Sequence, residues 1–443
     1  MPLPLIDFIL CPRCAGPLAP QDKGAFRCRS CDQRFPAVDK LPCLLPDLRP
    51  WKQRWQGQLA FVEKQAELTV DALQEEGRKP GLLPTTQERL RQQIAAQATL
   101  VREVQALLLP AVGQRAPGAA AELELRPLES LHLLFRDWGW PESDENARAL
   151  QCVEQVLSAP LGRVLVIGAG ACRLAYDLHV QHGADTTLAL DVDPLLLGVA
   201  QKLLAGARVE LTESRIDAVG LHEARASREL KAPQGAAAGM HLLLADGLAP
   251  PLRARSFDTV VTPWFIDQVP PDLRELIGVL HGLLVPEGRW LNFGPLIYPA
   301  GHAGGCRFSA DELFELQRRA GFTLDKTVTV PLPYSVSPLT RRGKQEHCLA
   351  FSARATEPPS DEPGELPSWI VLPYLPVPDF AGRVDFEHES ATLRAVVSLI
   401  DGRRSVRDIG AALAASAGLD PPGMNDTVRY CLLQTHPACR GFS

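Results

Sequence analysis

The sequence lacks any long apolar run: no stretch approaches the roughly 18 uninterrupted apolar residues that a membrane-spanning helix needs. The apolar start MPLPLIDFIL has no basic segment before it, so no secretory signal is predicted. Strong positive charge is also missing: the net charge is −6, and no long basic run or basic helix with interleaved aromatic residues occurs. We therefore expect a cytoplasmic protein without a membrane or nucleic-acid partner.

The clearest local pattern is RVLVIGAGACRLAYDL, which predicts a strand over 163–167, a glycine turn and a helix from about Leu174 to His182. Gly168 and Gly170 let the backbone turn sharply and approach a ligand that a Cβ would obstruct. Proteins that bind NAD, FAD or S-adenosylmethionine share such a turn, and many turns of this kind bind nothing. The elements that follow must decide between these interpretations.

The next strands supply acidic residues at their ends. Asp191 ends the strand over 187–190 and lies 21 residues after Gly170, where a carboxylate can accept the two hydroxyls of a ribose. Asp246 follows the strand HLLL and can hydrogen-bond an adenine amine. No second nucleotide-binding half is present, which argues against a dehydrogenase.

The remaining order is a strand (FDTVVT), a helix (about 271–284), a PEG turn, a strand (RWLNF), a helix (310–320) and strands over 323–330 and 346–353. It resembles the class I S-adenosylmethionine-dependent methyltransferases, α/β proteins with a Rossmann-like seven-stranded sheet.

Five ordered motifs, RDW, GAGACRLAYDL, ADG, WFID and WLNFGPLIY, together resemble the carnosine N-methyltransferase family over about residues 55–355. The resemblance includes a Gln- and Leu-rich helical lead-in (51–112) and a long insertion (206–240). It implies S-adenosylmethionine as cofactor, held by these residues: Arg136, Gly168, Gly170, Asp191 and Asp246.

The resemblance also implies acceptor-binding residues. Asp267 in WFID matches the family's aspartate, and Tyr334 in PYSVSPL matches a tyrosine near the end of the domain, so we expect both in catalysis. Pro299 stands where the family has a histidine, with His302 as a possible replacement, and Leu133 stands where the family has a cofactor-contacting glutamine. The departure at Pro299 puts carnosine itself in doubt as the acceptor.

Asp267 also has a physical rationale. Methyl transfer is an in-line displacement, so the protein must place an acceptor lone pair opposite the departing sulfur and exclude water. An imidazole is mostly neutral at pH 7, and a carboxylate that holds its N–H selects the tautomer and stabilises the developing positive charge. The alternative is that Asp267 caps the helix that begins near Pro271.

Aromatic residues cluster around Asp267 in the sequence. Trp264 and Tyr298 lie in predicted loops at the carboxyl edge of the sheet, where ligands of such sheets collect, so we expect them to contact the acceptor together with His302. Trp290 and Phe293 lie in a predicted buried strand and are expected to pack in the core.

The amino terminus contains two C-x-x-C pairs, Cys11 with Cys14 and Cys28 with Cys31, which can bind a tetrahedral Zn²⁺. Four thiolates leave no ligand position for water, so the predicted zinc is structural. Eleven cysteines, an odd number, disfavour a disulfide framework. CPRCAGPL, FRCRSC and FPAVDKLPCLLP resemble the zinc-ribbon proteins that activate tRNA and translation-factor methyltransferases, which implies a ribbon docked on the methyltransferase. Cys43 is expected to be a buried apolar residue.

The last segment follows the linker-like stretch TEPPSDEPGELPS. WIVLPYLPVPDF is strand-like, and LRAVVSLIDGRRSVRDIGAALAA predicts a helix, a turn and a helix with Val406, Ile409 and Leu413 in its core. The pattern resembles small winged-helix modules related to peptide-chaperone domains.

The sequence thus predicts four parts: a zinc ribbon (1–50), a helical lead-in (51–125), a methyltransferase domain (126–356) and a winged-helix-like module (369–443). The predicted activity is N-methylation of the imidazole of a small histidine-containing, carnosine-like compound. Two alternatives are a methyltransferase for a peptide or natural-product intermediate and a scaffold without activity.

Overall fold

The computed structural model describes residues 3–114, 126–158, 160–215, 217–218, 220–268, 272–340, 342–361, 365–380, 390–418, 421–439 and 442. The chain forms two compact units. The first comprises Met1–Phe265, Arg289–Pro295 and Lys326–Ser352, and the second comprises Ile266–Gly288, Leu296–Asp325 and Ala353–Ser443.

The first unit begins with a small antiparallel sheet of three short strands, β1 (Leu18–Pro20), β2 (Phe26–Cys28) and β3 (Arg34–Phe35). Two 3₁₀ turns, Leu5–Asp7 and Asp22–Gly24, complete this part. The expected ribbon is thus present at the level of the backbone.

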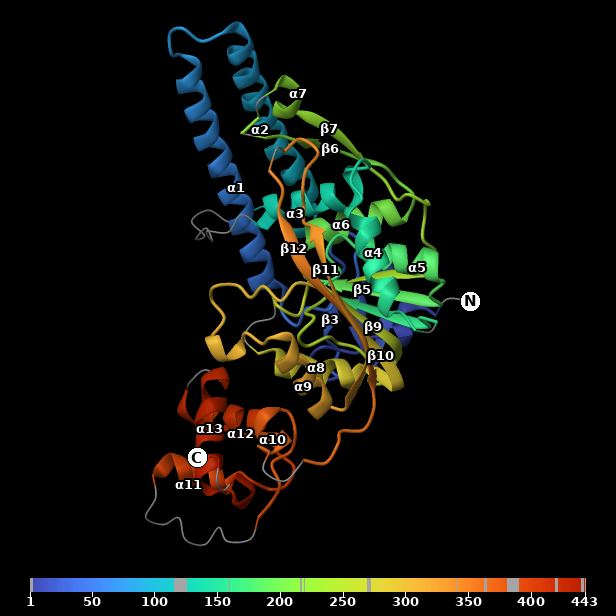
Figure 1. The fold of residues 1–443 in the computed structure, drawn as a ribbon, viewed down its shortest axis with the longest axis vertical. Coiled ribbons are helices and arrows are strands. Elements are labelled where there is room, and N and C mark those ends of the chain that lie inside the picture. Colours follow the sequence, from blue (N-terminus) through green and yellow to red (C-terminus); the bar gives the residue numbers. More distant parts are fainter. Residues whose placement is uncertain are drawn as a thin grey trace. The chain divides into compact units, whose positions relative to one another are not determined.

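A helical hairpin follows, with α1 (Leu48–Gly77) and α2 (Pro84–Val112) side by side (Figure 1). The Asp47 carboxylate caps α1 by accepting from the Arg49 N–H, and Pro84 occupies the first turn of α2, where no N–H is needed. The helical lead-in predicted over 51–112 is therefore confirmed.

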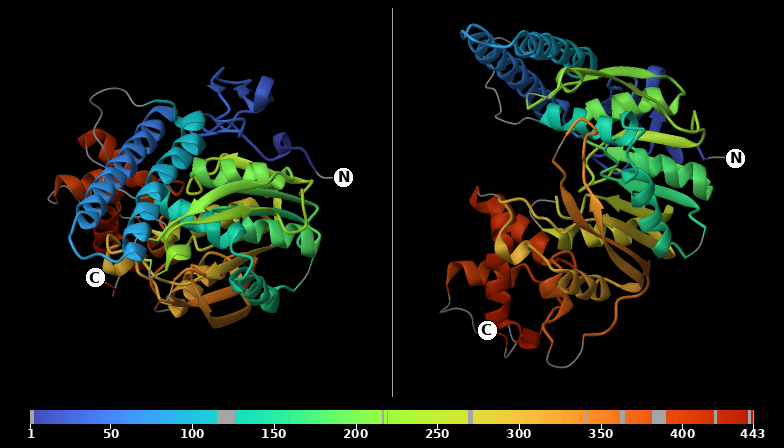
Figure 2. Two further views of the ribbon diagram at one scale, coloured as in Figure 1. Left: turned by 90° about the horizontal axis from the view of Figure 1, so that it is seen from above. Right: turned by 45° about the horizontal axis from the view of Figure 1, so that its top comes forward.

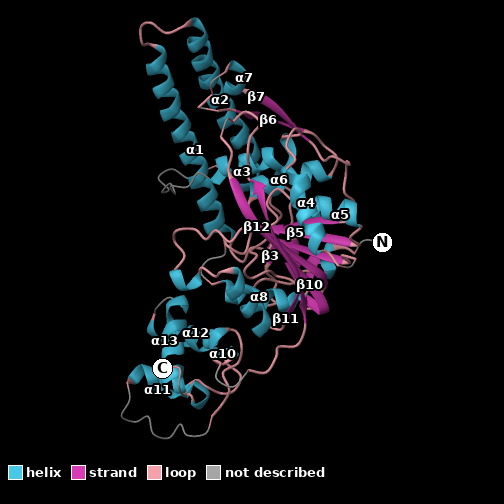
Figure 3. Ribbon diagram, in the orientation of Figure 1, coloured by secondary structure: helices cyan, strands magenta, loops and turns pink. Residues whose placement is uncertain are grey.

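The central sheet has seven strands in the order β11-β12-β10-β9-β4-β5-β8. Its strands β4, β5, β8 and β9 run parallel to one another and are mostly apolar, as expected for strands buried on both faces. Within the first unit, the helices α5 (Arg173–His182) and α6 (Pro194–Leu204) pack against strands of this sheet (Figure 3). This is the Rossmann-like class I methyltransferase fold that the sequence predicts. Apart from a π-helical turn and the insertion, both described below, the elements that follow the hairpin are α3 (Arg126–Leu134), α4 (Glu145–Val156), β4 (Arg163–Ile167), α5 (Arg173–His182), β5 (Thr186–Asp191), α6 (Pro194–Leu204), β8 (Met240–Leu244), β9 (Phe257–Pro263), α8 (Leu273–Leu283), β10 (Leu284–Gly294), a 3₁₀ turn (Gly304–Cys306), α9 (Ala310–Arg319), β11 (Phe322–Pro333) and β12 (Gln345–Ala355).

The predicted insertion after α6 forms a separate two-stranded sheet. Its strands β6 (Val209–Glu213) and β7 (Ala226–Leu230) pair antiparallel and flank the short helix α7 (Leu221–Ala224). Figure 2 shows this sheet beside the helical hairpin. The Glu103 carboxylate of α2 accepts hydrogen bonds from the N–H and hydroxyl of Thr212, which fixes the insertion to the hairpin.

The segment that leaves the ribbon covers the outer edge of β8. The Leu244 N–H donates to the Pro42 carbonyl, the Leu44 N–H donates to the Leu244 carbonyl, and Cys43 pairs with Leu244 as in a parallel bridge. Cys43 is 1% exposed, and burial raises the pKa of its thiol to about 11. The expectation of a buried, apolar Cys43 is confirmed.

The second unit ends in a helical module with α10 (Ser368–Val371), α11 (Ala391–Ser398), α12 (Val406–Ala417), α13 (Pro421–Thr435) and a final 3₁₀ turn (Pro437–Cys439). The helix, turn and helix predicted for 393–415 are confirmed, and the core contains Val406, Ile409 and Leu413. The strand expected at 369–380 is wrong: its first residues belong to α10, the next form turns, and only Pro376 makes an isolated bridge, with Ser405. Residues 381–389, where a wing could lie, are outside the described residues, so the winged-helix assignment stays a prediction.

Candidate active site

Parallel register brings the predicted cofactor residues of the first unit to one edge of the sheet. Ile167 pairs with Leu190, Leu190 pairs with Leu243, and Val166 pairs with Val261. The segments that begin at Gly168, Asp191, Ala245 and Trp264 therefore leave adjacent strands at their carboxyl ends. Ligands of open α/β sheets bind at this edge.

The glycine turn is shaped by positive φ angles, 69° at Gly168 and 55° at Gly170. A Cβ on Gly168 would lie 2.4 Å from Cδ2 of Phe265, whereas a Cβ on Gly170 would meet no protein atom within 4 Å. Gly168 is therefore required by the protein itself, while Gly170 borders open space. The same ring lies 3.1 Å from the position of a Cβ on Gly247, so Phe265 packs against both glycines.

Replacing Gly168 by alanine should destabilise the protein by about 2 kcal/mol or more, because the clash with Phe265 adds to the strain of a positive φ. Gly170→Ala, which meets only the φ strain, should cost about 1 kcal/mol. Urea unfolding measures both changes. Phe265→Ala should reduce the cost of Gly168→Ala; equal costs with and without the ring would contradict this explanation.

Asp191 is fixed beside the glycine turn. Its Oδ2 accepts from the Gly170 N–H at 2.8 Å, and its Oδ1 accepts from the N–H groups of Val192 (2.7 Å) and Asp193 (2.9 Å). Asp246 is half-buried, and its Oδ1 accepts from the Leu248 N–H at 2.9 Å. The structure thus brings Asp191 to Gly170, although the assignment of both carboxylates to an adenosine remains a prediction.

Arg136 lies in a π-helical turn, Phe135–Gly139, that supports the glycine segment. The Trp138 indole donates to the Ala171 carbonyl at 2.9 Å, and Arg173 donates to the Asp137 carbonyl at 2.6 Å. Arg136 is buried, its Nε donates to the Asp137 carboxylate at 2.6 Å, and its guanidinium lies 4.7 Å from the Trp264 ring centroid. These contacts hold Arg136 at the edge of the sheet.

Tyr334 begins the connection between β11 and β12, close to Arg136. The guanidinium lies 5.8 Å from the Tyr334 ring centroid, and the Lys344 ammonium lies 4.6 Å from it. Burial raises the pKa of the Tyr334 phenol, so the hydroxyl stays protonated near neutral pH and can donate a hydrogen bond. The structure therefore brings together three predicted residues: Arg136, Trp264 and Tyr334.

Three further side chains hold the backbone after Tyr334. The Ser335 N–H donates to Glu145 Oε2 at 2.7 Å, the His132 ring donates to the Ser335 carbonyl at 2.9 Å, and the Ser337 hydroxyl donates to the Glu213 carboxylate. Ser335 has a φ of 54°, an uncommon value for a residue other than glycine. Two buried carboxylates therefore fix the position of this loop.

Glu145 should make stability depend on pH. Burial raises its pKa from 4.5 to about 7, although Arg136 and the Ser335 N–H favour the carboxylate. Between these pH values the folded chain holds a proton that the unfolded chain has lost, so the unfolding free energy should fall as pH rises from about 4.5 to 7. Glu145→Gln should remove this part of the slope in urea unfolding at pH 5 to 8. If the unfolding free energies of the wild type and of the Glu145→Gln variant changed with pH in parallel, this role of Glu145 would be contradicted.

Asp267 belongs to the second unit and is 2% exposed. Its Oδ2 accepts from the Ile297 N–H at 3.0 Å, which ties the loop after β9 to the segment that contains Tyr298. The cap of α8 is Asp272, whose carboxylate accepts from the Arg274 N–H. The alternative in which Asp267 caps this helix is therefore wrong.

Tyr298 and His302 are neighbours in the same unit, with ring centroids 5.7 Å apart. The Tyr298 hydroxyl donates to the Phe308 carbonyl at 3.0 Å, and burial raises the pKa of Tyr298 to about 12. The phenol is thus a neutral group already engaged as a donor. Contact of either residue with an acceptor remains a prediction.

Trp290 and Phe293 are core residues, as expected, since both are fully buried. The Trp290 indole donates to the Thr262 hydroxyl at 2.8 Å, and that hydroxyl donates to Asn292 Oδ1 at 2.9 Å. The edge-on contact of Trp264 with Phe293, at 4.5 Å between centroids, connects this core to the site.

The four predicted metal ligands lie together, with the sulfur atoms of Cys11, Cys14, Cys28 and Cys31 all within 4.8 Å of one another. Four thiolates about 2.3 Å from a tetrahedral Zn²⁺ would lie about 3.8 Å apart, so the spacing fits zinc. The N–H groups of Cys31 and Ser30 lower the pKa of Cys28 to about 6, which favours its thiolate. The cluster fits the predicted structural metal.

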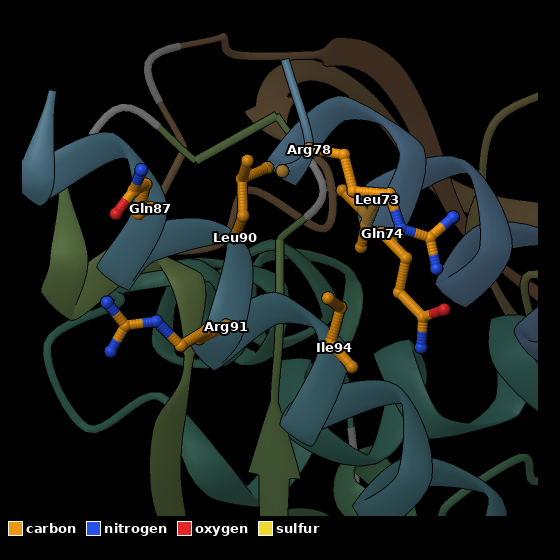
Figure 4. A pocket seen from close by; sticks show the side chains of 8 residues that line it. Leu73, Gln74, Arg78, Gln87, Leu90, Arg91 and Ile94 are labelled. Carbon is orange, nitrogen blue, oxygen red and sulfur yellow. The ribbon is translucent and has the colours of Figure 1, made fainter. Parts of the chain in front are cut away.

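A separate surface hollow of about 350 Å³ lies near the tip of the hairpin (Figure 4). It contains none of the predicted site residues, and Arg91 on its rim forms an ion pair with Glu88. Its lining mixes apolar side chains with glutamine and arginine side chains and contains no group of residues that indicates a catalytic or metal-binding site. The hollow is lined by Leu73, Gln74, Gly77, Arg78, Gln87, Leu90, Arg91 and Ile94.

Comparison with models of known protein families gives a match in the later part of the predicted methyltransferase domain. Residues 213–357 match the family model for carnosine N-methyltransferase. The resemblance drawn from the sequence motifs is thereby confirmed over these residues, and the chain carries a methyltransferase domain. The matched segment of this domain includes Asp246, Asp267 and Tyr334, whereas Arg136 and the glycine turn precede it.

Solved structures similar to the methyltransferase domain share little sequence with it. A putative methyltransferase from Bacillus halodurans is 11% identical, with 48% of this chain and 100% of that chain covered and a TM-score of 0.33. A possible histamine N-methyltransferase from Thermotoga maritima is 16% identical, with coverages of 52% and 96% and a TM-score of 0.31. Phosphoethanolamine N-methyltransferase 2 from Haemonchus contortus is 13% identical, with coverages of 53% and 58% and a TM-score of 0.34. Comparison with curated protein sequences gives no match.

In the part of the chain that the structure describes, no helix has both the length and the apolar character needed to cross a membrane.

Proposed function

We propose that this methyltransferase uses S-adenosylmethionine to methylate an imidazole nitrogen of a small histidine-containing compound. The family match over 213–357 is the observation that carries the proposal, because this segment contains Asp267 and Tyr334. Bound S-adenosylmethionine would supply an electrophilic methyl group on a sulfonium. The chain must then position the acceptor, exclude water and stabilise the positive charge that develops on the ring.

On the cofactor side, the open space at Gly170 permits close approach of an adenosine to the backbone. The Asp191 carboxylate is suited to ribose hydroxyls, Asp246 to an adenine amine, and Arg136 to a carboxylate. These residues fit S-adenosylmethionine in charge and hydrogen-bonding type.

On the acceptor side, the Asp267 carboxylate would hold one imidazole N–H, so that the other ring nitrogen presents its lone pair. Its burial strengthens this electrostatic interaction, because the surrounding dielectric is low. For Tyr334, Trp264, Tyr298 and His302, contact with the acceptor stays a separate proposal for each residue, drawn from the sequence. The proton of the methylated ring would leave to solvent.

Pro299 replaces the family's histidine, so carnosine is one candidate acceptor among several. Transfer of a labelled methyl group should be measured with carnosine, histidine, histidine-containing peptides and a primary amine. We expect imidazole compounds to be methylated and the amine to be inert. If a compound without an imidazole were labelled and the imidazole compounds were not, the imidazole assignment would be refuted.

The cofactor assignment has an independent test, which also separates an enzyme from a scaffold. Calorimetric titration with S-adenosylmethionine should show saturable binding. Absence of any heat, together with an unchanged melting temperature, would refute the proposed function.

The proposal includes a structural Zn²⁺ held by the four amino-terminal cysteines. The spacing of their sulfur atoms supports it. Because all four positions are thiolates, the metal would stabilise the ribbon and take no part in methyl transfer.

A further inference from the structure

A buried carboxylate of the insertion, Glu213, holds residues 334–340, which we call the Tyr334 loop. Glu213 is 4% exposed and ends β6. Its Oε1 accepts from the Ser337 hydroxyl, and its Oε2 accepts from the Trp140 indole at 3.0 Å and from Arg228 Nε at 2.7 Å. Arg228 balances its charge, so both oxygens are satisfied within the protein.

Ser337 is the residue of the loop that receives this contact, and it is 1% exposed. Its hydroxyl oxygen also accepts from the Leu339 N–H at 3.1 Å, and its carbonyl accepts from the Thr340 N–H at 2.9 Å. At the start of the loop, the Tyr334 N–H donates to the Lys344 carbonyl at 2.9 Å. The conformation of the loop therefore depends on the Ser337 hydroxyl at its centre.

The insertion is itself anchored on the helical hairpin. Successive side chains of a strand point to opposite faces. Thr212 of β6 contacts Glu103 of α2 through its N–H and its hydroxyl, both at 2.9 Å. The next residue, Glu213, contacts the Tyr334 loop, and Arg228 supports it from the paired strand β7. The small sheet therefore connects the hairpin to this loop through neighbouring residues.

Directional hydrogen bonds distinguish this contact from ordinary packing. A buried ion pair adds little net stability over apolar side chains of similar size, yet its hydrogen bonds impose a defined geometry on its partners. Ser337 lies three residues after Tyr334, whose ring centroid is 5.8 Å from the Arg136 guanidinium. A shift of the loop would move the phenol, and a misplacement of about 1 Å at a site can cost about a hundredfold in rate.

We propose that Glu213 is a positioning residue for methyl transfer, which acts through Ser337 to place the Tyr334 phenol for the acceptor. The insertion, which carries both Glu213 and Arg228, thereby helps to determine how well the acceptor is used. This inference rests on the proposed function, because it requires Tyr334 to contact the methyl acceptor.

The test uses two variants that disturb the contact from opposite sides. Ser337→Ala removes the hydroxyl on the loop, and Arg228→Met removes the cation that supports Glu213 from the insertion. Steady-state transfer of a labelled methyl group to an imidazole acceptor gives kcat/KM. Calorimetry with S-adenosylhomocysteine gives the affinity for the cofactor product.

Each variant has a matched control in the same unit. Ser352→Ala removes another fully buried hydroxyl, which lies in β12 and has no hydrogen-bond partner among the described residues. Arg208→Met removes an exposed arginine of the insertion region that pairs with Glu229 at 2.9 Å. Neither control touches the Tyr334 loop through a hydrogen bond among the described residues.

Ser337→Ala and Arg228→Met should each lower kcat/KM for the acceptor about tenfold or more, with the affinity for S-adenosylhomocysteine within about twofold and both controls like wild type. In a Tyr334→Phe background, which already lacks the phenol hydroxyl, Ser337→Ala should lower kcat/KM less than about twofold further, because residues that act as a unit are not additive. Unchanged transfer, equal loss of S-adenosylhomocysteine affinity, or a full further loss in the Tyr334→Phe background would overturn the inference.

The position of the loop also has a test that does not depend on activity. Ser337→Ala should speed hydrogen exchange of the Ser335, Val336 and Leu339 amides about tenfold and leave that of β4 unchanged. Unchanged exchange in the loop would overturn the role of Glu213 whether or not the protein transfers a methyl group. Absence of methyl transfer by the wild type to every acceptor would refute the proposed function, and with it the role of this contact in catalysis.

Discussion

Asp267→Asn should lower the rate of methyl transfer about a hundredfold while the affinity for S-adenosylhomocysteine stays unchanged. The amide oxygen can still accept from the Ile297 N–H, so the loop contact at 3.0 Å should survive and only the charge is lost. A neutral amide cannot stabilise the positive charge on the imidazole ring as a buried carboxylate does. Single-turnover transfer of a labelled methyl group measures the change.

Asp272→Asn is the control for this variant, since it alters a carboxylate five residues away that caps α8. It keeps the cap but removes the charge that pairs with Arg274, so it should lower stability while leaving the transfer rate near that of wild type. If Asp267→Asn remained within about threefold of wild type, the catalytic role of Asp267 would be wrong. A loss of cofactor affinity would indicate a general disturbance of the fold.

Cys28→Ser should have the largest effect on stability. Cys28 is 1% exposed, and its sulfur lies 3.5 Å from that of Cys14, so the change should remove a zinc ligand and open the ribbon. A structural zinc contributes several kcal/mol to the folding of a small domain that has little core of its own. Native mass spectrometry should show one zinc per wild-type chain and none in the variant, together with a lower melting temperature.

Cys306→Ser is the matched control, because Cys306 is half-buried and lies outside the four-cysteine cluster. It should keep the metal and melt like wild type. A wild-type protein that contains no zinc after purification with zinc present, or a Cys28→Ser variant with full zinc content, would refute the metal assignment.

The parallel strands β4, β5, β8 and β9 could be predicted from the sequence because each is a short, mostly apolar run. The strand over 163–167 has the bounds of β4 as predicted, and the alternation of strands and helices predicts the parallel sheet. The strand expected at 369–380 is absent: a short apolar run also suits a buried helical turn, which periodicity cannot separate from a strand over four residues, and the prolines that follow interrupt strand pairing.

The residues that surround the predicted site residues could not be predicted from the sequence. Arg136 and Tyr334 were found through motifs, yet Glu145 reads as an ordinary acidic residue at the start of a helix, and Ser335 as a loop residue. Their contact joins positions 190 residues apart, and nothing in either local sequence signals it. No local sequence signal indicates that Phe265 packs against Gly168, because this contact depends on the three-dimensional arrangement of two separate loops.

The segment 42–44, which follows the ribbon, pairs with β8 and covers part of its outer edge. β8 is the last strand of its sheet, and an uncovered outer strand exposes N–H and carbonyl groups that can pair with another chain. If the proposed zinc is removed and the ribbon unfolds, we expect the segment 42–44 to detach and the edge of β8 at Leu244 to become exposed. Metal starvation should therefore appear first as concentration-dependent oligomers, visible by light scattering, before the sheet itself melts.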